Sequence, residues 1–85
     1  MSNPSMKKSI HSSEQKNLDR LLRQIRLGKG LRQEDLARLL GKPQSFVSNY
    51  ERGERRLDLL EVRQICEAVG ISLTDFVQRF EESLR

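Results

Sequence analysis

The segment Gln33–Gly53, QEDLARLLGKPQSFVSNYERG, decides how this chain folds. Its first eight residues carry leucines and an alanine at helical spacing, and Gly41 then interrupts the pattern. Pro43 follows, and proline is tolerated at a helix start because its missing N–H would have no helical partner there. Beyond it the helical spacing resumes, with Val47 and Tyr50 on one side. The segment therefore predicts two short helices joined by a tight turn.

The second of these helices, predicted over 44–52, has an unusual outer face. With Val47 and Tyr50 turned inward, the outward side chains are Gln44, Ser45, Ser48 and Asn49. A merely solvated helix face usually carries Lys and Glu, whereas amides and hydroxyls are the groups that hydrogen-bond to base edges in DNA. Two helices joined in this way form a helix-turn-helix, whose second helix can enter the major groove.

The rest of the chain predicts three further helices and no strand. Ser12, Asp58 and Ser72 are suitable N-cap residues, and Gly70 is a suitable end signal. Apolar residues follow the caps at helical spacing. The predicted apolar stripes comprise Leu18, Leu21, Leu22 and Ile25; Val62, Ile65, Cys66 and Val69; and Leu73, Phe76, Val77, Phe80 and Leu84. We expect an all-α, compact five-helix fold.

A chain of 85 residues is long enough for one small domain. Residues 1–11 are polar and show no period, so we expect a flexible N-terminal arm followed by a single domain over 12–85. Lys7 and Lys8 could reach along a DNA backbone, but a disordered tail is the preferred interpretation. His11 is interpreted as an arm residue and not as a metal ligand.

The net charge of +4 is unevenly distributed along the chain. Residues 20–56 contain ten Lys and Arg against four Asp and Glu, whereas residues 57–85 contain three against six. Small basic domains are common, and such a face is often only solvated. On a helix-turn-helix, however, the asymmetry favours a surface for phosphates.

The composition argues against several other classes of protein. With one cysteine, Cys66, and one histidine, the chain has no internal disulfide and too few ligands for a cysteine-based metal site. No Ser/His/Asp, Cys/His or paired-carboxylate set can be assembled, and we expect the acidic residues on solvent faces or helix caps. We therefore expect no enzyme activity, no metal, no cofactor and no small-molecule ligand.

Location and RNA binding are judged on the same basis. No apolar run approaches the roughly 18 residues of a membrane span, and the N-terminal segment lacks the apolar core of a secretory signal. A cytoplasmic location is expected. RNA binding is disfavoured because no aromatic platform for stacking bases is apparent.

The chain resembles the Cro/repressor-type (XRE-like) helix-turn-helix family over roughly 21–77. QEDLARLLG is similar to the second helix of that family, and QSFVSNYERG to its third. LDLLEVRQICEAVGISLTDF resembles the fourth and fifth helices. The resemblance implies a lambda-repressor-like fold and sequence-specific binding of double-stranded DNA, with residues 33–53 as the motif.

The resemblance also implies roles for individual residues. Gln44, Ser45 and Asn49 match positions that read base edges, and Ser48 lies beside them. Gln33 matches a glutamine that contacts a phosphate and braces the third helix. Arg26 and Glu51 match an ion pair between the first and third helices. The flanking side chains suited to phosphate contacts are Arg32, Lys42, Arg52, Arg55 and Arg56.

Two positions depart from the family pattern. Arg32 stands where Thr or Ser is common as N-cap; arginine is a poor N-cap residue, but its guanidinium could contact a phosphate. Phe46 stands where small polar residues are common. It either packs against the second helix or touches a thymine methyl, and we favour packing.

We expect a transcription regulator that binds a palindromic operator as a homodimer. Phe76, Phe80 and Leu84 could pack within the monomer or extend into the dimer interface, and we favour the second. The alternative function is a protein-interaction or antitoxin-like module that reuses the fold. Salt separates the two, because binding to phosphates weakens steeply with ionic strength and an apolar interface does not.

Overall fold

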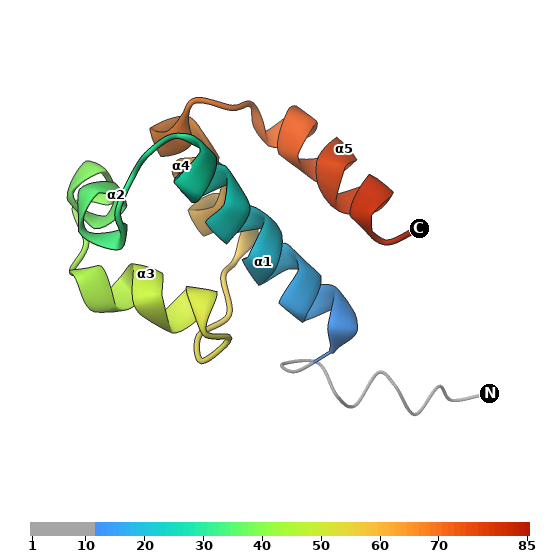
Figure 1. Ribbon diagram of the computed structural model, residues 1–85, viewed down its shortest axis with the longest axis horizontal. Coiled ribbons are helices and arrows are strands. Elements are labelled where there is room, and N and C mark those ends of the chain that lie inside the picture. Colours follow the sequence, from blue (N-terminus) through green and yellow to red (C-terminus); the bar gives the residue numbers. More distant parts are fainter. Residues whose placement is uncertain (1–11) are drawn as a thin grey trace.

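The computed structural model describes residues 12–85, which form five helices and no strand (Figure 1). The helices are α1 (Ser13–Gly28), α2 (Gln33–Leu40), α3 (Gln44–Glu51), α4 (Leu59–Val69) and α5 (Leu73–Ser83). The predicted all-α, five-helix fold is confirmed, and the predicted helix-turn-helix is formed by α2 and α3. The expected N-terminal arm, residues 1–11 with Lys7, Lys8 and His11, lies outside the described residues.

The helices enclose one small core. α2 packs on α3 and α4, while α1 packs on α3 and α5, so α1 lies across the middle of the molecule (Figure 1). The fully buried side chains come from all five helices: Leu22, Leu36, Val47, Tyr50, Ile65, Cys66 and Phe76. Burial raises the pKa of the Cys66 thiol to about 11, as expected of an apolar packing residue and not of a reactive thiolate.

The helix ends follow the predicted signals. The Ser12 hydroxyl accepts from the Gln15 N–H, and Asp58 and Ser72 accept from the third residue of α4 and α5. Gly41, between α2 and α3, has φ of 67°, in the left-handed region that side chains with a Cβ rarely adopt. The tight turn of the motif therefore depends on glycine at this position.

One prediction about the core is wrong, and the apolar side of α5 is covered only in part. On α5 only Phe76 is fully enclosed, while Val77 is 42% exposed. α5 packs against α1 and α4 with one side only, so the wider predicted stripe is not covered. Asp19, expected on a solvent face or cap, is 4% exposed because it faces the turn after α3, where Gly53 lies.

Within residues 12–85, no helix is both long enough and apolar enough to cross a membrane. The same part of the chain contains no cluster of three or more His, Cys, Asp or Glu side chains that would hold a metal ion.

Candidate nucleic-acid interface

The exposed face of α3 is polar, and its position follows from helical spacing. Phe46, Val47 and Tyr50 are buried against the rest of the domain. The remaining side chains therefore point away from the core. Gln44 and Ser45 are exposed, and Ser48 and Asn49 are partly exposed. The structure thus brings the four expected base-reading residues onto one surface.

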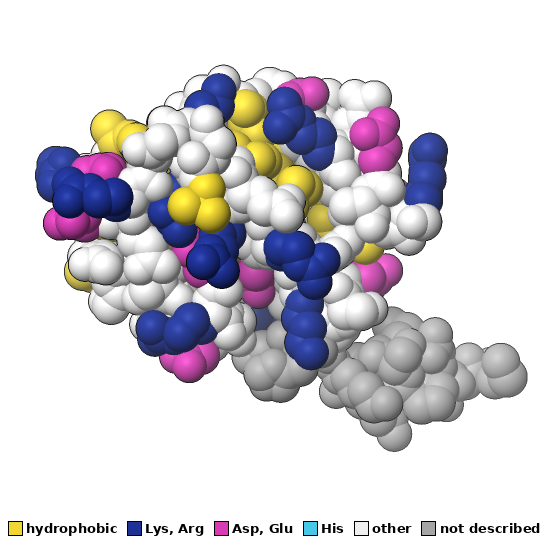
Figure 2. Space-filling view, in the orientation of Figure 1, with side chains coloured by type: hydrophobic (Ala, Val, Ile, Leu, Met, Phe, Trp, Pro, Cys, Tyr) yellow, Lys and Arg dark blue, Asp and Glu magenta, His cyan; other side chains and the backbone are white. Residues whose placement is uncertain are grey.

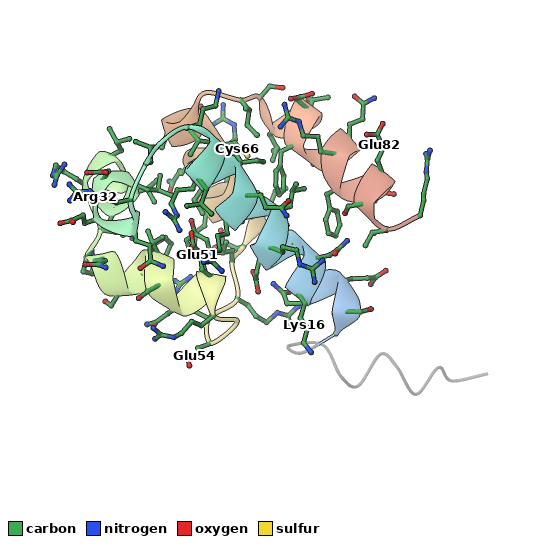
Figure 3. All side chains as sticks on the ribbon, in the orientation of Figure 1. Lys16, Arg32, Glu51, Glu54, Cys66 and Glu82 are labelled. Carbon is green, nitrogen blue, oxygen red and sulfur yellow. The ribbon has the colours of Figure 1, made fainter. Side chains whose placement is uncertain are left out.

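α3 is tied to α1 by an ion pair at its C-terminal end. Arg26 Nε lies 2.7 Å from Glu51 Oε2, and Arg26 Nη2 lies 3.0 Å from Glu51 Oε1. The two side chains are only 6% and 3% exposed, and Glu51 lies between α1 and α3 (Figure 3). The third guanidinium nitrogen donates to the Leu31 carbonyl at 2.7 Å. Hydrogen bonding to Glu51 raises the pKa of Arg26.

Gln33 extends this ion pair to the N-terminal end of α3. Its Nε2 donates to Glu51 Oε1 at 3.0 Å, and its Oε1 accepts from Gln44 Nε2 at 3.4 Å. Gln33 is the first residue of α2. The positive end of the α2 helix dipole therefore lies on the same side of the molecule as the contact between Gln33 and Gln44. A continuous set of contacts from Arg26 through Glu51 and Gln33 therefore orients the Gln44 side chain before any ligand binds.

Arg52 lies beside the polar face at the end of α3. It donates to Asn49 Oδ1 at 2.7 Å and pairs with Glu54 at 3.1 Å. The Asn49 amide therefore has its oxygen engaged and its N–H groups free to donate. Ser48 hydroxyl donates to the Ser45 carbonyl at 3.4 Å, a weak bond that leaves both hydroxyl groups available to a ligand.

Phe46 packs inward, as favoured from the sequence, and two cationic side chains lie over its ring. Its ring makes an edge-on contact with Tyr50 at a centroid distance of 5.6 Å. Lys42 Nζ lies 5.5 Å and Arg55 Cζ 4.7 Å from the centre of the Phe46 ring. The Arg55 contact was not expected from the sequence, because Arg55 lies nine residues from Phe46 and beyond the end of α3.

Arg55 also pairs with Glu61, through Nη2 and Oε2 at 2.8 Å. This contact lowers the pKa of Glu61, which caps α4 by accepting from the Asp58 N–H. Arg55 thus stacks on α3 and holds the start of α4 at once. Neighbouring Arg56 is exposed and has no ion-pair partner among the described residues. Arg55 and Arg56, both expected to contact phosphates, therefore have different surroundings.

Arg32 precedes α2 and makes no side-chain cap, since a guanidinium has no acceptor. Instead the Asp35 carboxylate accepts from the Arg32 N–H at 2.9 Å and from its guanidinium at 3.0 and 3.1 Å. These hydrogen bonds lower the pKa of Asp35 to about 2. Only half of a capping box is therefore formed. The Asp35 side chain accepts from the Arg32 N–H, but the Arg32 side chain does not accept from the backbone of α2.

Sequence comparison connects this geometry to known proteins. The family model for the helix-turn-helix HTH_3 matches residues 22–76, most of the chain. An uncharacterized HTH-type transcriptional regulator, y4dJ of Sinorhizobium fredii (strain NBRC 101917 / NGR234), is 30% identical over 59 residues. That match covers 69% of this chain and 77% of the relative.

Solved structures of helix-turn-helix proteins are also similar to this chain. An XRE-family like protein from Pseudomonas syringae pv. tomato str. DC3000 is 36% identical with a TM-score of 0.82, covering 94% of this chain and 98% of its own. The restriction-modification controller protein C.Esp1396I, a tetramer in complex with its natural 35 base-pair operator, is 26% identical with a TM-score of 0.78. That match covers 85% of this chain and 95% of the controller chain. The chain belongs to the Cro/repressor-type (XRE-like) helix-turn-helix family of DNA-binding transcriptional regulators.

Proposed function

We propose that this protein binds a specific palindromic operator as a homodimer, with α3 of each copy in the major groove. The observation that carries the proposal is the set of contacts from Arg26 through Glu51 and Gln33 to Gln44. It holds a polar, short helix at a fixed angle on the surface. A helix of eight residues is too short to be stable alone, so its packing and these contacts determine what it presents.

Base reading is assigned to the outer face of α3. Gln44 has its carbonyl oxygen and one amide N–H free, the pattern that pairs with the N6 and N7 edge of adenine. Asn49 donates from its amide while Arg52 occupies its oxygen, so a bidentate contact there requires Arg52 to turn to a phosphate. Ser45 and Ser48 supply hydroxyls that donate or accept as the base requires.

Phosphate contacts are assigned to the margin of α3. Gln33 lies at the N-terminus of α2, where free backbone N–H groups favour an anion. Arg56 and Lys42 are exposed cations without an acidic partner within residues 12–85. Arg32, Arg52 and Arg55 each have an acidic partner already, so they reach a phosphate only by exchanging it. We therefore expect Gln33, Arg56 and Lys42 to contribute more to phosphate binding than the three paired arginines.

The reading role is tested by replacing Gln44. Gln44→Ala should leave the melting temperature unchanged and weaken binding to the operator by about 1–3 kcal/mol, with relaxed preference at one base position. Gln78→Ala removes another exposed glutamine, from α5, and serves as the control. Equal affinity and equal base preference for both variants would remove α3 from the role of reading helix.

The dimer is proposed on a different surface from the one favoured by the sequence. Phe76 is enclosed within the monomer, while Val77 and Leu84, on and directly after α5, are 42% and 37% exposed. Leu59 and Leu60, by contrast, are 66% and 69% exposed, more than any other large apolar side chain in residues 12–85. They form the first turn of α4, directly after the connection that carries Arg55 and Arg56. A two-fold interface centred on them would bring the two basic connections together.

Leu60→Glu tests this surface. Glutamate in the first turn of a helix suits the helix dipole, so the fold should tolerate it. We expect light scattering to show a shift from dimer to monomer and binding to the palindrome to lose its cooperativity. Leu39→Glu, at a leucine 60% exposed on α2, is the matched control and should leave the dimer intact. Identical behaviour of the two variants would exclude the α4 surface.

A further inference from the structure

Three cationic side chains of α1 form a stripe that none of the roles above includes. Lys16, Arg20 and Arg23 are spaced four and three residues apart, so they lie on one side of the helix. All three are exposed. Figure 2 shows Lys and Arg side chains gathered along the lower part of the face that α1 presents.

These cations differ from three other exposed arginines on helices in having no acidic partner within residues 12–85. Arg38, Arg63 and Arg79 each lie within 3.5 Å of an Asp or Glu three or four residues away on the same helix. Within residues 12–85, Lys16, Arg20 and Arg23 form no ion pair, and Arg20 donates only to the neutral Asn17 oxygen at 2.9 Å. Like charges at this spacing destabilise a helix slightly, by a few tenths of a kcal/mol per pair.

The stripe adjoins the end of α3. The three side chains, together with Arg52 and Gly53, line a cleft of about 220 Å³ between α1 and the turn after α3. Asp19 and Glu51 also line it, but Asp19 is buried, and Glu51 is held by Arg26 and Gln33. The rim of the cleft is therefore cationic. Lys16 and Glu54 both lie on the lower side of the molecule, below the ends of α1 and α3 (Figure 3).

Arg52 connects the cleft to the reading face. Its guanidinium donates to Asn49, a proposed base-reading residue, and its side chain also forms part of the cleft wall. Arg52, which is paired with Glu54, thus links Asn49 to the cationic stripe of α1. Any duplex that α3 engages must have a phosphate strand close to this end of the helix.

We infer that Lys16, Arg20 and Arg23 form an accessory binding site for the phosphate backbone that flanks the half-site read by α3. From Lys16 to Arg23 the helix rises about 10 Å, at 1.5 Å per residue. Successive phosphates of one strand advance about 3.4 Å along the duplex axis, so the stripe matches about three of them. The inference rests on the proposed DNA-binding function and extends its footprint beyond the motif.

The salt dependence of binding tests the inference. The full chain and its variants are titrated at several salt concentrations with the operator duplex and with an unrelated duplex of mixed sequence. Each lost phosphate contact should reduce the slope of log Kobs against log salt by about 0.9, so Arg20→Ala with Arg23→Ala should reduce it by up to about 2. Affinity should fall to the same degree for operator and unrelated duplexes, and Lys16→Ala should reduce the slope further.

A double variant of equal charge is the control. Arg63→Ala with Arg79→Ala also removes two exposed arginines, from α4 and α5, and should leave the slope unchanged. The Arg20 and Arg23 variant should melt at or above the wild-type temperature, because it relieves repulsion without removing an ion pair. Equal slopes for the two double variants would overturn the inference. Binding of the stripe to an acidic protein surface and not to DNA would also overturn it. If the wild type binds duplex DNA and Gln44→Ala relaxes its preference, that failure concerns the stripe alone; no binding by the wild type would overturn both proposals.

Discussion

Glu51 and Asp19 are two buried carboxylates in very different surroundings. Glu51 accepts from Arg26 and Gln33 at 2.7–3.0 Å, so its charge is matched by several donors. Within residues 12–85, Asp19 has one hydrogen bond, from Gln15 at 3.3 Å. Because burial removes water from it with little compensation, the pKa of Asp19 is raised above the usual 3.8. The first carboxylate stabilises the position of α3, and the second is a source of instability.

Removal of one partner of the ion pair should be strongly destabilising. Glu51→Ala leaves Arg26 buried without its counter-ion, and we expect a loss of about 3 kcal/mol in the free energy of unfolding. Glu82→Ala, at an exposed position on α5, should change it by less than about 0.5 kcal/mol. Denaturant titration of both variants measures the difference. Equal losses would show that the ion pair does not hold α3 in place.

Asp19 makes the stability depend on pH in a defined direction. Since its folded pKa lies above the ordinary 3.8, the folded state binds more protons between the two values, and stability falls as pH rises through that range. Asp19→Asn removes the charge and should be more stable than the wild type at pH 7. Thermal melting at pH 7 and pH 3 measures the change.

The gain should disappear near pH 3, where the wild-type carboxyl is protonated in both states. A variant that is less stable than the wild type at pH 7 would mean that the nearby cations of α1 stabilise the ionised form.

At the scale of the helices, the two N-caps Arg32 and Asp58 offer a direct comparison. Both precede a helix whose third residue is acidic and accepts from the cap backbone N–H. Only Asp58 also accepts in return, from the Glu61 N–H at 2.8 Å. The complete capping box therefore occurs on α4 alone.

Asp58→Ala should lower the free energy of unfolding by about 1 kcal/mol, the usual contribution of a capping side chain. Arg32→Ala should lower it by less, because it removes only exposed ion pairs. Urea denaturation of the two variants provides the comparison. A larger loss for Arg32→Ala would show that its contacts with Glu34 and Asp35 act as more than surface pairs.

The helices could be predicted from the sequence because their signals are local. Contacts between residues distant in the sequence could not be predicted. Caps, glycines and apolar spacing act within a few residues, so they predicted the five helices to within a residue or two. The stacking of Arg55 on Phe46 and the burial of Asp19 depend on how α1, α3 and α4 meet. Periodicity also could not distinguish the enclosed Phe76 from the exposed Val77, because both lie on the apolar side of α5.

At the scale of the whole domain, residues 12–85 present two surfaces for the proposed partners: the polar face of α3 with its flanking cations, and the exposed leucines of α4. The chain is small, and its core is centred on seven fully buried side chains. Any further stabilisation of the fold must therefore come from binding to partners. Operator DNA and a second copy are the two proposed partners, and each uses a different surface. Two-fold symmetry would place the α3 helices about 34 Å apart, on successive turns of the duplex.

Selection of bound sequences from random duplex DNA tests the central claim most directly. The wild type should enrich a palindrome whose half-sites are about 10 base pairs apart, and Gln44→Ala should lose the preference at one position in each half-site. Enrichment of no sequence by the wild type, or of the same sequence by both proteins, would contradict the claim that α3 reads the operator.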